Sequence, residues 1–300
     1  MNKILNIGSI NIDYVYDVRH FVRPGETISA NSLNVFPGGK GLNQSIAFAR
    51  AGASIYHAGR VGADGRGMIE VMRDSGVNTD LIDSSGKATG HAIIQVNDSG
   101  ENCIILFPGA NREFDGDFID SALADFGAGD FLVLQNEINN ISYCIEAAHK
   151  RGLRVAFNLA PFGSEIKNYP LELVDFFLFN EIEGRELSGV YESDDILNKM
   201  ASLFPNASFV LTLGKDGVRY KDAHRTLSHG IYDVPVVDTT AAGDTFTGFF
   251  ISALVEGEPT AEALRIASIA SAIAVSRKGA SSSVPKLSEV RRANLRYMAP

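Results

Sequence analysis

Cysteine is nearly absent from this chain. Only Cys103 and Cys144 occur among 300 residues, far apart and outside any CxxC or Cys/His cluster. Cysteines this sparse are typical of reduced core thiols and argue against a disulfide framework or a zinc site. The first residues, MNKILNIGSINID, hold too short an apolar run for a signal peptide, and no segment approaches the roughly 18 apolar residues of a membrane span. We therefore expect a cytoplasmic protein without a membrane partner.

Positive charge is also in short supply. The formal net charge is −9, and the basic doublets Lys150-Arg151 and Arg291-Arg292 are too short to form a basic surface. Nucleic acids and anionic membranes both need such a surface, so neither is an expected partner. An acidic protein still binds a small polyanion such as ATP when backbone amides, a metal and one or two local cations hold the phosphates.

Two common nucleotide-binding motifs are missing. No Gly stands five residues before the Gly of a Gly-Lys pair, so a Walker A motif is absent. GADGRG at 62–67 has the wrong spacing for a Rossmann GxGxxG. Phosphate binding, if it occurs, must use a different kind of loop.

Short apolar runs alternate with helical periodicity along most of the chain, in a composition that is 45% hydrophobic and 21% charged. Strands are predicted at 3–10, 53–62, 130–135, 153–160, 175–180 and 208–214. Amphipathic or apolar helical patterns fill the intervals. This alternation predicts βαβ units, and hence an α/β protein with a mostly parallel sheet covered by helices on both faces.

Two segments break the alternation. Residues 12–36 and 88–107 carry strand pairs around turn-rich centres such as NDSGEN, and no helix follows to cover them. We predict a small antiparallel sheet set apart from the main layer, as a lid over one edge. The chain has no repeat or linker, so residues 1–300 are predicted to form a single domain with this lid.

PGGKGLNQSIAFARAG (37–52) is the first candidate ligand loop. Its glycines allow close backbone approach, and a helix begins directly after Lys40-Gly41. For an arbitrary GGKG, a plain strand-to-helix turn with a solvated Lys40 is the more common explanation. Asn43 and Gln44 on the first helical turn add polar groups facing the same place, which favours binding.

DTTAAGDTFTGFFISAL (238–254) is the stronger candidate. Thr239 to Gly243 form a turn, and Asp244 falls on the first turn of an apolar helix. The amides of Ala241, Ala242, Gly243 and Asp244 would then form an anion hole at the positive end of the helix dipole. Asp244 alone also fits a helix cap. GAGD at 127–130 looks similar, but a strand follows Asp130, so that copy is expected to be structural.

Taken together, the motifs resemble those of the ribokinase-like (PfkB) family of carbohydrate kinases. The matching stretches occur in family order, with the spacing of ribokinases: NID (11–13), PGGKGLNQ (37–44), VGADGRG (61–67), GAN (109–111), QNE (135–137), NEIEGREL (180–187), TLGKDG (212–217), VDTTAAGDTFTGFF (237–250) and AVSRKGASSSVP (274–285). The resemblance implies a ribokinase-like three-layer α/β/α sandwich with a β-lid, and ATP-dependent phosphorylation of a sugar hydroxyl with Mg²⁺ and often K⁺.

The resemblance also implies residue roles. Asp244 would be the general base, because a carboxylate within reach can accept the proton of the attacking hydroxyl, while the amides of 241–244 stabilise the transferring phosphoryl group. Sugar binding would fall to Asn11, Asp13, Gly39, Lys40, Asn43, Glu137 and Asp244. The nucleotide and its Mg²⁺ would be met by Asn180, Glu183, Thr212, Gly214, Gly217, Ala242, Gly243, Ser268 and Ser271. A K⁺ site would use Asp238, Thr240, Ala274, Arg277, Gly279 and Ser283, mostly through backbone carbonyls.

The family's lid also forms a homodimer contact, so a homodimer is expected. This sequence departs from typical ribokinases at Leu42, where Ala is common, and at His91 and Phe107-Pro108 in or beside the lid strands. Those departures leave the sugar open: ribose is the first candidate, and a nucleoside, another ketose or a deoxysugar is the alternative. A non-catalytic sugar-sensing protein is the alternative of another class.

Overall fold

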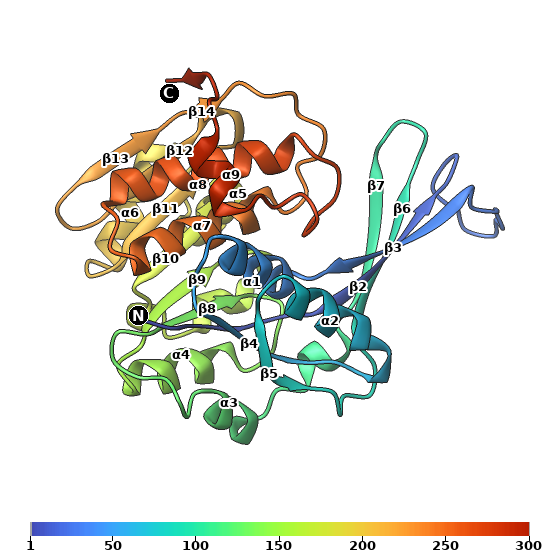
Figure 1. The fold of residues 1–300 in the computed structure, drawn as a ribbon, viewed down its shortest axis with the longest axis horizontal. Helices are drawn as coiled ribbons and strands as arrows, with labels where there is room; N and C mark the ends of the chain where they lie inside the picture. Colours follow the sequence, from blue (N-terminus) through green and yellow to red (C-terminus); the bar gives the residue numbers. More distant parts are fainter. Residues whose placement is uncertain (1, 300) are drawn as a thin grey trace.

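A nine-stranded sheet forms the centre of the computed structural model, which describes residues 2–299 (Figure 1). Seven adjacent strands run parallel in the order β11–β10–β9–β8–β1–β4–β5. Every residue of the neighbouring strands β1 and β8 is buried, as expected for parallel strands covered on both faces. The bounds are β1 (Ile4–Ile7), β4 (Ile55–Arg60), β5 (Asn78–Asp83), β8 (Phe131–Gln135), β9 (Arg154–Asn158), β10 (Phe176–Asn180) and β11 (Ser208–Thr212).

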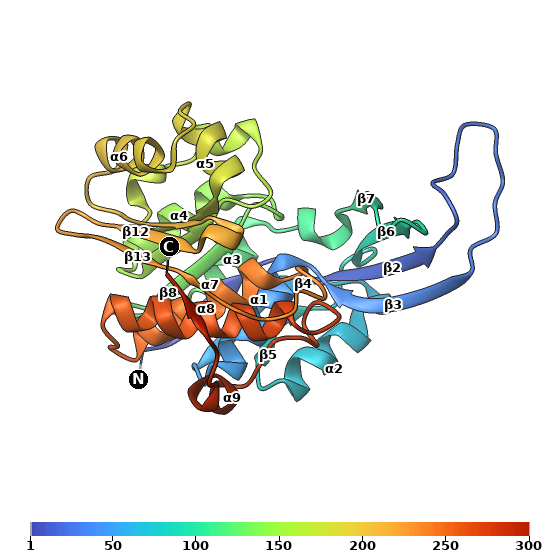
Figure 2. The same ribbon diagram turned by 90° about the horizontal axis from the view of Figure 1, so that it is seen from above.

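Helices cover both faces of this sheet (Figure 2) and bury one apolar core on each side. One layer holds α1 (Lys40–Arg50), α2 (Arg66–Asp74), α7 (Ala242–Val255), α8 (Thr260–Val275) and α9 (Leu287–Arg292). The opposite layer holds α3 (Gly116–Ala122), α4 (Ile141–Lys150), α5 (Glu181–Ser188) and α6 (Ser193–Leu203). The predicted three-layer α/β/α sandwich is confirmed.

A second, four-stranded sheet projects from the body (Figures 1 and 2). It consists of β3 (Ser32–Gly38), β2 (Asn11–Asp17), β6 (Gly90–Val96) and β7 (Asn102–Phe107), in that order. The pairs β2/β3 and β6/β7 are antiparallel as predicted, and a parallel pairing of β2 with β6 joins them. We call this sheet the lid. Many of its apolar side chains are exposed, from 36% for Ile93 to 62% for Ile105.

Several elements escape prediction from sequence. The edge strand β5 reads NTDLID, and the edge hairpin β12 (Val218–Lys221) with β13 (Thr226–His229) reads VRYK and TLSH, so none contains an apolar run. Edge strands expose one side and mix polar with apolar residues, which hides them from a search for buried strands. The short pair β14 (Ile231–Tyr232) and β15 (Tyr297–Met298) brings the end of the described chain against the body.

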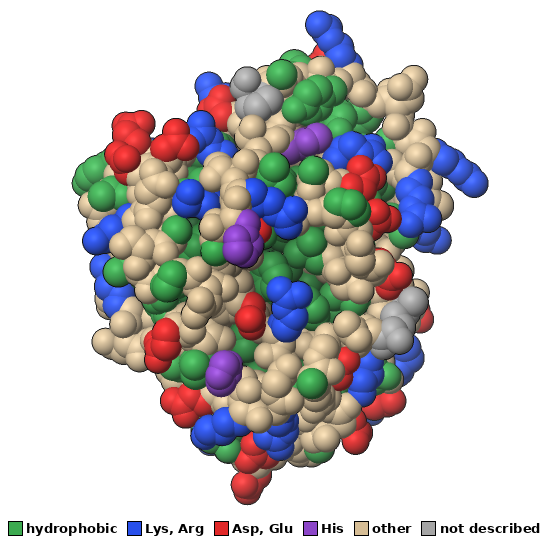
Figure 3. All heavy atoms as spheres, turned by 90° about the vertical axis from the view of Figure 1, so that its left-hand side faces the viewer, with side chains coloured by type: hydrophobic (Ala, Val, Ile, Leu, Met, Phe, Trp, Pro, Cys, Tyr) green, Lys and Arg blue, Asp and Glu red, His purple; other side chains and the backbone are tan. Residues whose placement is uncertain are grey.

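Charge is distributed without a basic surface on the face shown in Figure 3, where Lys and Arg are interspersed with Asp and Glu. Within residues 2–299, no helix combines the length and apolar character that crossing a membrane requires. Asp130 has the structural role predicted for it: it accepts hydrogen bonds from the amides of Lys3 (2.7 Å) and Gly127 (3.1 Å) just before β8.

Candidate active site

Helix α7 begins in a turn that leaves backbone amides free. Ala241, its N-cap, has the left-handed φ of 58°, a conformation that costs a non-glycine residue roughly 1 kcal/mol or more. The amide of Ala242 donates to the Thr239 carbonyl (3.2 Å) and thereby closes the turn. Among the described residues, the amides of Ala241, Gly243 and Asp244 have no partner. The sequence predicts four free amides at residues 241–244, and three of these are free in the structure.

The space in front of these amides is open. A Cβ built on Gly243 would meet no atom within 4 Å, so the turn has a cradle at its centre. Free N–H groups and the dipole of a 14-residue helix favour an anion at this place. Ser271 on α8, predicted to lie near adenine, donates to the Ala242 carbonyl (3.2 Å) and supports the turn. Ser268 lies one turn earlier on α8, and neither serine lines the cavity described below.

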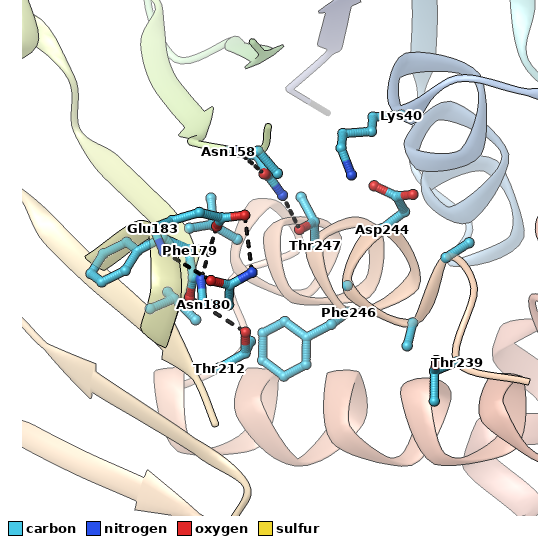
Figure 4. A pocket seen from close by; sticks show the side chains of 16 residues that line it. Lys40, Asn158, Phe179, Asn180, Glu183, Thr212, Thr239, Asp244, Phe246 and Thr247 are labelled. Carbon is cyan, nitrogen blue, oxygen red and sulfur yellow. Dashed lines mark hydrogen bonds between the residues drawn. The ribbon is translucent and has the colours of Figure 1, made fainter. Parts of the chain in front are cut away.

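Asp244 is the third residue of α7, and its carboxylate is buried against α1. It accepts hydrogen bonds from the amide groups of Gln44 (2.9 Å) and Asn43 (3.4 Å), and the residue is 7% exposed. Lys40, the first residue of α1, points toward it (Figure 4). Burial alone would lower the pKa of Lys40, but the carboxylates of Asp244, Glu137 and Glu183 outweigh burial and raise it. Lys40 is therefore a permanent cation in this acidic site.

Loop 37–40 packs against the connection between β1 and β2. Gly39 has a φ of 89°, and a Cβ there would lie 3.0 Å from the Ser9 carbonyl and the Asn11 amide. A Cβ on Gly38 would overlap the Asp13 carboxylate at 2.2 Å. The glycines of PGGKG are thus required by close approach, which brings Asn11 and Asp13 beside Lys40.

The predicted sugar-binding carboxylates come together beneath the lid. Glu137, after β8, accepts from the Lys40 amide (3.0 Å) and from the Ser9 hydroxyl. Asp13 lies on β2, where desolvation, helped by the negative charge of Glu137, raises its pKa to about 6. Asn11 is 4% exposed, and its Oδ1 accepts from Asn111 (2.7 Å). That contact fixes the orientation of the Asn11 amide.

A cavity of about 250 Å³ extends from Lys40 and Asp244 toward the carboxyl ends of β9, β10 and β11 (Figure 4). Ligands commonly bind at this edge of an open α/β sheet. The cavity contains eight of the predicted residues: Lys40, Asn180, Glu183, Thr212, Ala241, Ala242, Gly243 and Asp244. The other residues predicted to bind the sugar, on the lid side, do not line this cavity. Lys40 and Asp244 therefore stand between the cavity and these lid-side residues.

Asn180 and Glu183 form a complete capping box at the start of α5. Asn180 Oδ1 accepts from the Glu183 amide (3.0 Å), and Glu183 Oε2 accepts from the Asn180 amide (2.9 Å). Glu183 is 8% exposed, and burial is the main cause that raises its pKa. Asn180 and Glu183 therefore start helix α5 and also line the cavity.

The remaining residues predicted to meet the nucleotide lie at the end of β11 and in the turn that follows. Thr212, at the end of β11, lines the cavity. Gly214 and Gly217 follow in a turn with φ values of 55° and 87°. A Cβ on Gly217 would lie 2.2 Å from the His229 carbonyl, so this glycine is needed for the packing of the β12–β13 hairpin.

Asp238 ties together the two loops predicted to hold K⁺. Its Oδ1 accepts from the Thr240 hydroxyl (2.6 Å) and amide (2.9 Å), and its Oδ2 accepts from the Gly279 amide (2.9 Å). The guanidinium of Arg277 turns to Glu289 (2.6 Å), so only its backbone faces this region. A carboxylate among loop carbonyls and hydroxyls is a donor set suited to a hard cation. Ala274 lies in the last turn of α8, and Ser283 lies on the loop that follows this helix.

Several site residues were missed from sequence. Asn158, at the end of β9, donates to Thr247 on α7 (3.5 Å), and both line the cavity. Ser9 and Asn111 support Glu137 and Asn11, although only the GAN motif gave any signal for them. Leu42, where the chain departs from typical ribokinases, is fully buried in the apolar core on the α1 side of the sheet.

The fold is an α/β/α sandwich with a lid at one edge, and its cavity joins helix-start amides to a buried carboxylate. These features together define the class of small-molecule kinases. Comparison with known proteins gives the family. The model of the pfkB family carbohydrate kinases matches residues 1–287. The ribokinase of Haemophilus influenzae is 36% identical over 299 residues, covering 96% of this chain and 97% of the relative. The deoxyribokinase of Salmonella typhi is 30% identical, covering 94% and 95%.

A solved structure of Arabidopsis thaliana ribokinase, complexed with ribose and ATP, superposes with a TM-score of 0.88 at 30% identity. The match covers 97% of this chain and 98% of that one. The chain belongs to the pfkB family of carbohydrate kinases, and it is an ATP-dependent carbohydrate kinase of the ribokinase type.

Proposed function

We propose that this kinase transfers the γ-phosphate of ATP to a hydroxyl of ribose, with Asp244 as the general base. The observation that carries the proposal is the position of the Asp244 carboxylate. It is buried, it accepts two amide hydrogen bonds from α1, and it stands directly beside the free amides of its own helix start. A hydroxyl bound there would give its proton to Asp244 while the amides of Ala241, Gly243 and Asp244 stabilise the transferring phosphoryl group.

The sugar compartment has the polarity that a polyol needs. Asn43 is 7% exposed, and its Oδ1 has no partner among the described residues, although its NH₂ faces Asp244. A buried, unpaired acceptor is costly unless a ligand donates to it. A sugar hydroxyl would satisfy it, and the carboxylates of Asp13 and Glu137 would accept from further hydroxyls. Gly39 and Lys40 complete this compartment.

ATP fits the opposite compartment. The phosphates would lie over Gly243 and near Lys40, and the nucleoside would extend past Thr212. No cluster of three His, Cys, Asp or Glu side chains that could cage a metal occurs within residues 2–299. That sparse set suits Mg²⁺, which keeps waters and takes phosphate ligands, with Glu183 and Asn180 holding its water shell. When bound, Mg²⁺ would neutralise charge on the phosphate oxygens.

A K⁺ would be held by Asp238, Thr240 and carbonyls of the 274–283 loop. Its part would be to fix loop 238–241 and so the helix-start turn. The test is activity with K⁺ against the same concentration of Na⁺. An Asp238→Ala variant should lose the difference between the two ions. Equal wild-type rates in both ions would contradict the cation site.

The lid supports a proposed homodimer. Four apolar residues on one face of the lid are each about half exposed or more, which is unusual for a free surface: Leu33, Val35, Ile105 and Phe107. A second copy of the lid would cover them.

A substrate panel tests the proposed activity. Phosphorylation of ribose, 2-deoxyribose, other pentoses, hexoses and nucleosides is followed by ADP release at matched concentrations. We expect the highest kcat/KM with ribose. The second candidate is 2-deoxyribose, because the Salmonella typhi relative is a deoxyribokinase. No turnover of ribose would remove the first choice.

A further inference from the structure

We propose that Gln44 and Gln135 are positioning residues that fix the Asp244 carboxylate through a one-directional chain of buried side-chain amides. The inference rests on the proposed role of Asp244 and adds two residues that are buried and do not line the cavity. Gln44 donates to Asp244 Oδ1 (2.9 Å), and Gln135 donates to Gln44 Oε1 (2.7 Å). These contacts link α7 to α1 and then to the end of β8.

The chain continues to β1. The same NH₂ group of Gln135 also donates to Asn6 Oδ1 (3.0 Å), and the NH₂ group of Asn6 donates to the Gly41 carbonyl (2.9 Å) and to the Ser45 hydroxyl (2.9 Å). Gly41 belongs to the PGGKG loop that carries Lys40. The chain therefore runs from the loop of the sugar compartment, through the sheet, to the proposed base.

Only one set of amide orientations satisfies the hydrogen bonds at both ends of this chain of side chains. The Gly41 carbonyl only accepts, so Asn6 must present its NH₂ to it and its oxygen to Gln135. Gln135 must then present its NH₂ both to Asn6 and to Gln44, whose oxygen must face Gln135. The NH₂ of Gln44 is thereby left for Asp244, which as a carboxylate only accepts. Each end of the chain independently demands the same orientation of every amide.

Burial makes this orientation hard to reverse. Gln44 and Asn6 are 0% exposed and Gln135 is 1% exposed, so no water competes for the amides. Turning one amide would set two oxygens or two NH₂ groups against each other out of water, which is costly. The chain ends at Ser45, whose hydroxyl contacts His57 Nδ1 (2.8 Å). Burial lowers the pKa of His57 to about 3, so this end is uncharged at neutral pH.

A donor held in one orientation keeps Asp244 in one rotamer. In this rotamer Oδ2, which accepts only the 3.4 Å contact from Asn43, is the oxygen available to the attacking hydroxyl. Gln44→Met keeps the length of the side chain but removes the donor. We expect kcat to fall by roughly 10- to 100-fold, the range of a hydrogen bond to a charged group, while the KM values for sugar and ATP change by less than about threefold. Gln135→Met should lower kcat less, because it only frees Gln44 to turn.

A double-mutant cycle separates positioning from a general structural effect. If Gln44 acts through Asp244, adding Gln44→Met to Asp244→Asn should change kcat by less than about twofold. Ser252→Ala is the matched control, because Ser252 is a buried polar residue of the same helix α7 whose Oγ has no partner among the described residues. It should keep the parental kcat. Thermal melting of each variant confirms folding, and if Gln44→Met fails to fold, the cycle is run with Gln135→Met.

Two results would overturn the inference: unchanged kcat in Gln44→Met, or a full multiplicative loss in the double variant. Failure of the proposed function has a different signature. In that case Asp244→Asn alone keeps its activity, whatever the glutamine variants do.

Discussion

Gly248 of α7 lies directly against Ala47 of α1. A Cβ on Gly248 would be 2.4 Å from the Ala47 Cβ, a distance that real side chains do not adopt. Gly248 stands one turn after Asp244, and Ala47 stands one turn after Asn43 and Gln44. The close crossing of these two helices is therefore what brings the amides of α1 to the Asp244 carboxylate.

Gly248→Ala should separate the helices. We expect a loss of roughly 1–3 kcal/mol in the free energy of unfolding from overpacking, together with a fall in kcat because the contact of Gln44 with Asp244 lengthens. Chemical denaturation and steady-state kinetics measure the two effects. Gly67→Ala on α2 is the control, because a Cβ there meets no atom within 4 Å. It should leave kcat unchanged and be neutral or stabilising.

The buried carboxylate of Asp13 should lower the stability of the folded protein at neutral pH, although its proposed role is sugar binding. Its pKa is raised from 3.8 to about 6 in the folded protein, mainly by burial. Ionising Asp13 therefore costs folded-state stability: the cost is absent below pH 3.8 and complete above about pH 6, with an upper limit of roughly 3 kcal/mol. Asp13→Asn should melt like the parent near pH 4 and at higher temperature at pH 7.5, while its KM for the sugar rises. A Tm difference that does not grow with pH would contradict this.

Glu183 can be tested apart from its capping role. Gln also serves in a capping box, so Glu183→Gln should keep the start of α5 and shift Tm by no more than about 2 °C. Without the carboxylate charge, we expect the Mg²⁺ concentration for half-maximal activity to rise several-fold. Mg²⁺ titrations at fixed ATP measure this. An unchanged Mg²⁺ requirement would leave Glu183 with a purely structural role.

The dimer proposal depends on the exposed face of the lid. Ile105 is 62% exposed, so Ile105→Glu should not destabilise the single chain, but it would place charge in a lid-to-lid contact. We expect sedimentation to show dimers for the parent and monomers for the variant. Tyr191→Glu, at an even more exposed site (75%) outside the lid, should stay dimeric. A monomeric parent would refute the proposal.

The sequence predicts the buried strands and the helix-start motif well, because apolar runs and AAGD before an apolar helix have direct physical causes. It fails where the cause is tertiary. The Ala242 amide is occupied because it makes one hydrogen bond within the turn. Leu42 is buried because of its position around helix α1. The amides of Asn6 and Gln135 carry no local signal at all, since their meaning comes from strands that are distant in sequence and adjacent in the sheet.

The most direct measurement of the central claim is single-turnover phosphoryl transfer by Asp244→Asn with saturating ribose and ATP, alongside calorimetric ribose binding. Asn keeps the shape of the side chain but cannot accept the proton. We predict a loss of roughly 10²- to 10⁴-fold in the transfer rate with ribose binding retained in part. A transfer rate within about tenfold of the parent would contradict the assignment of Asp244 as the general base.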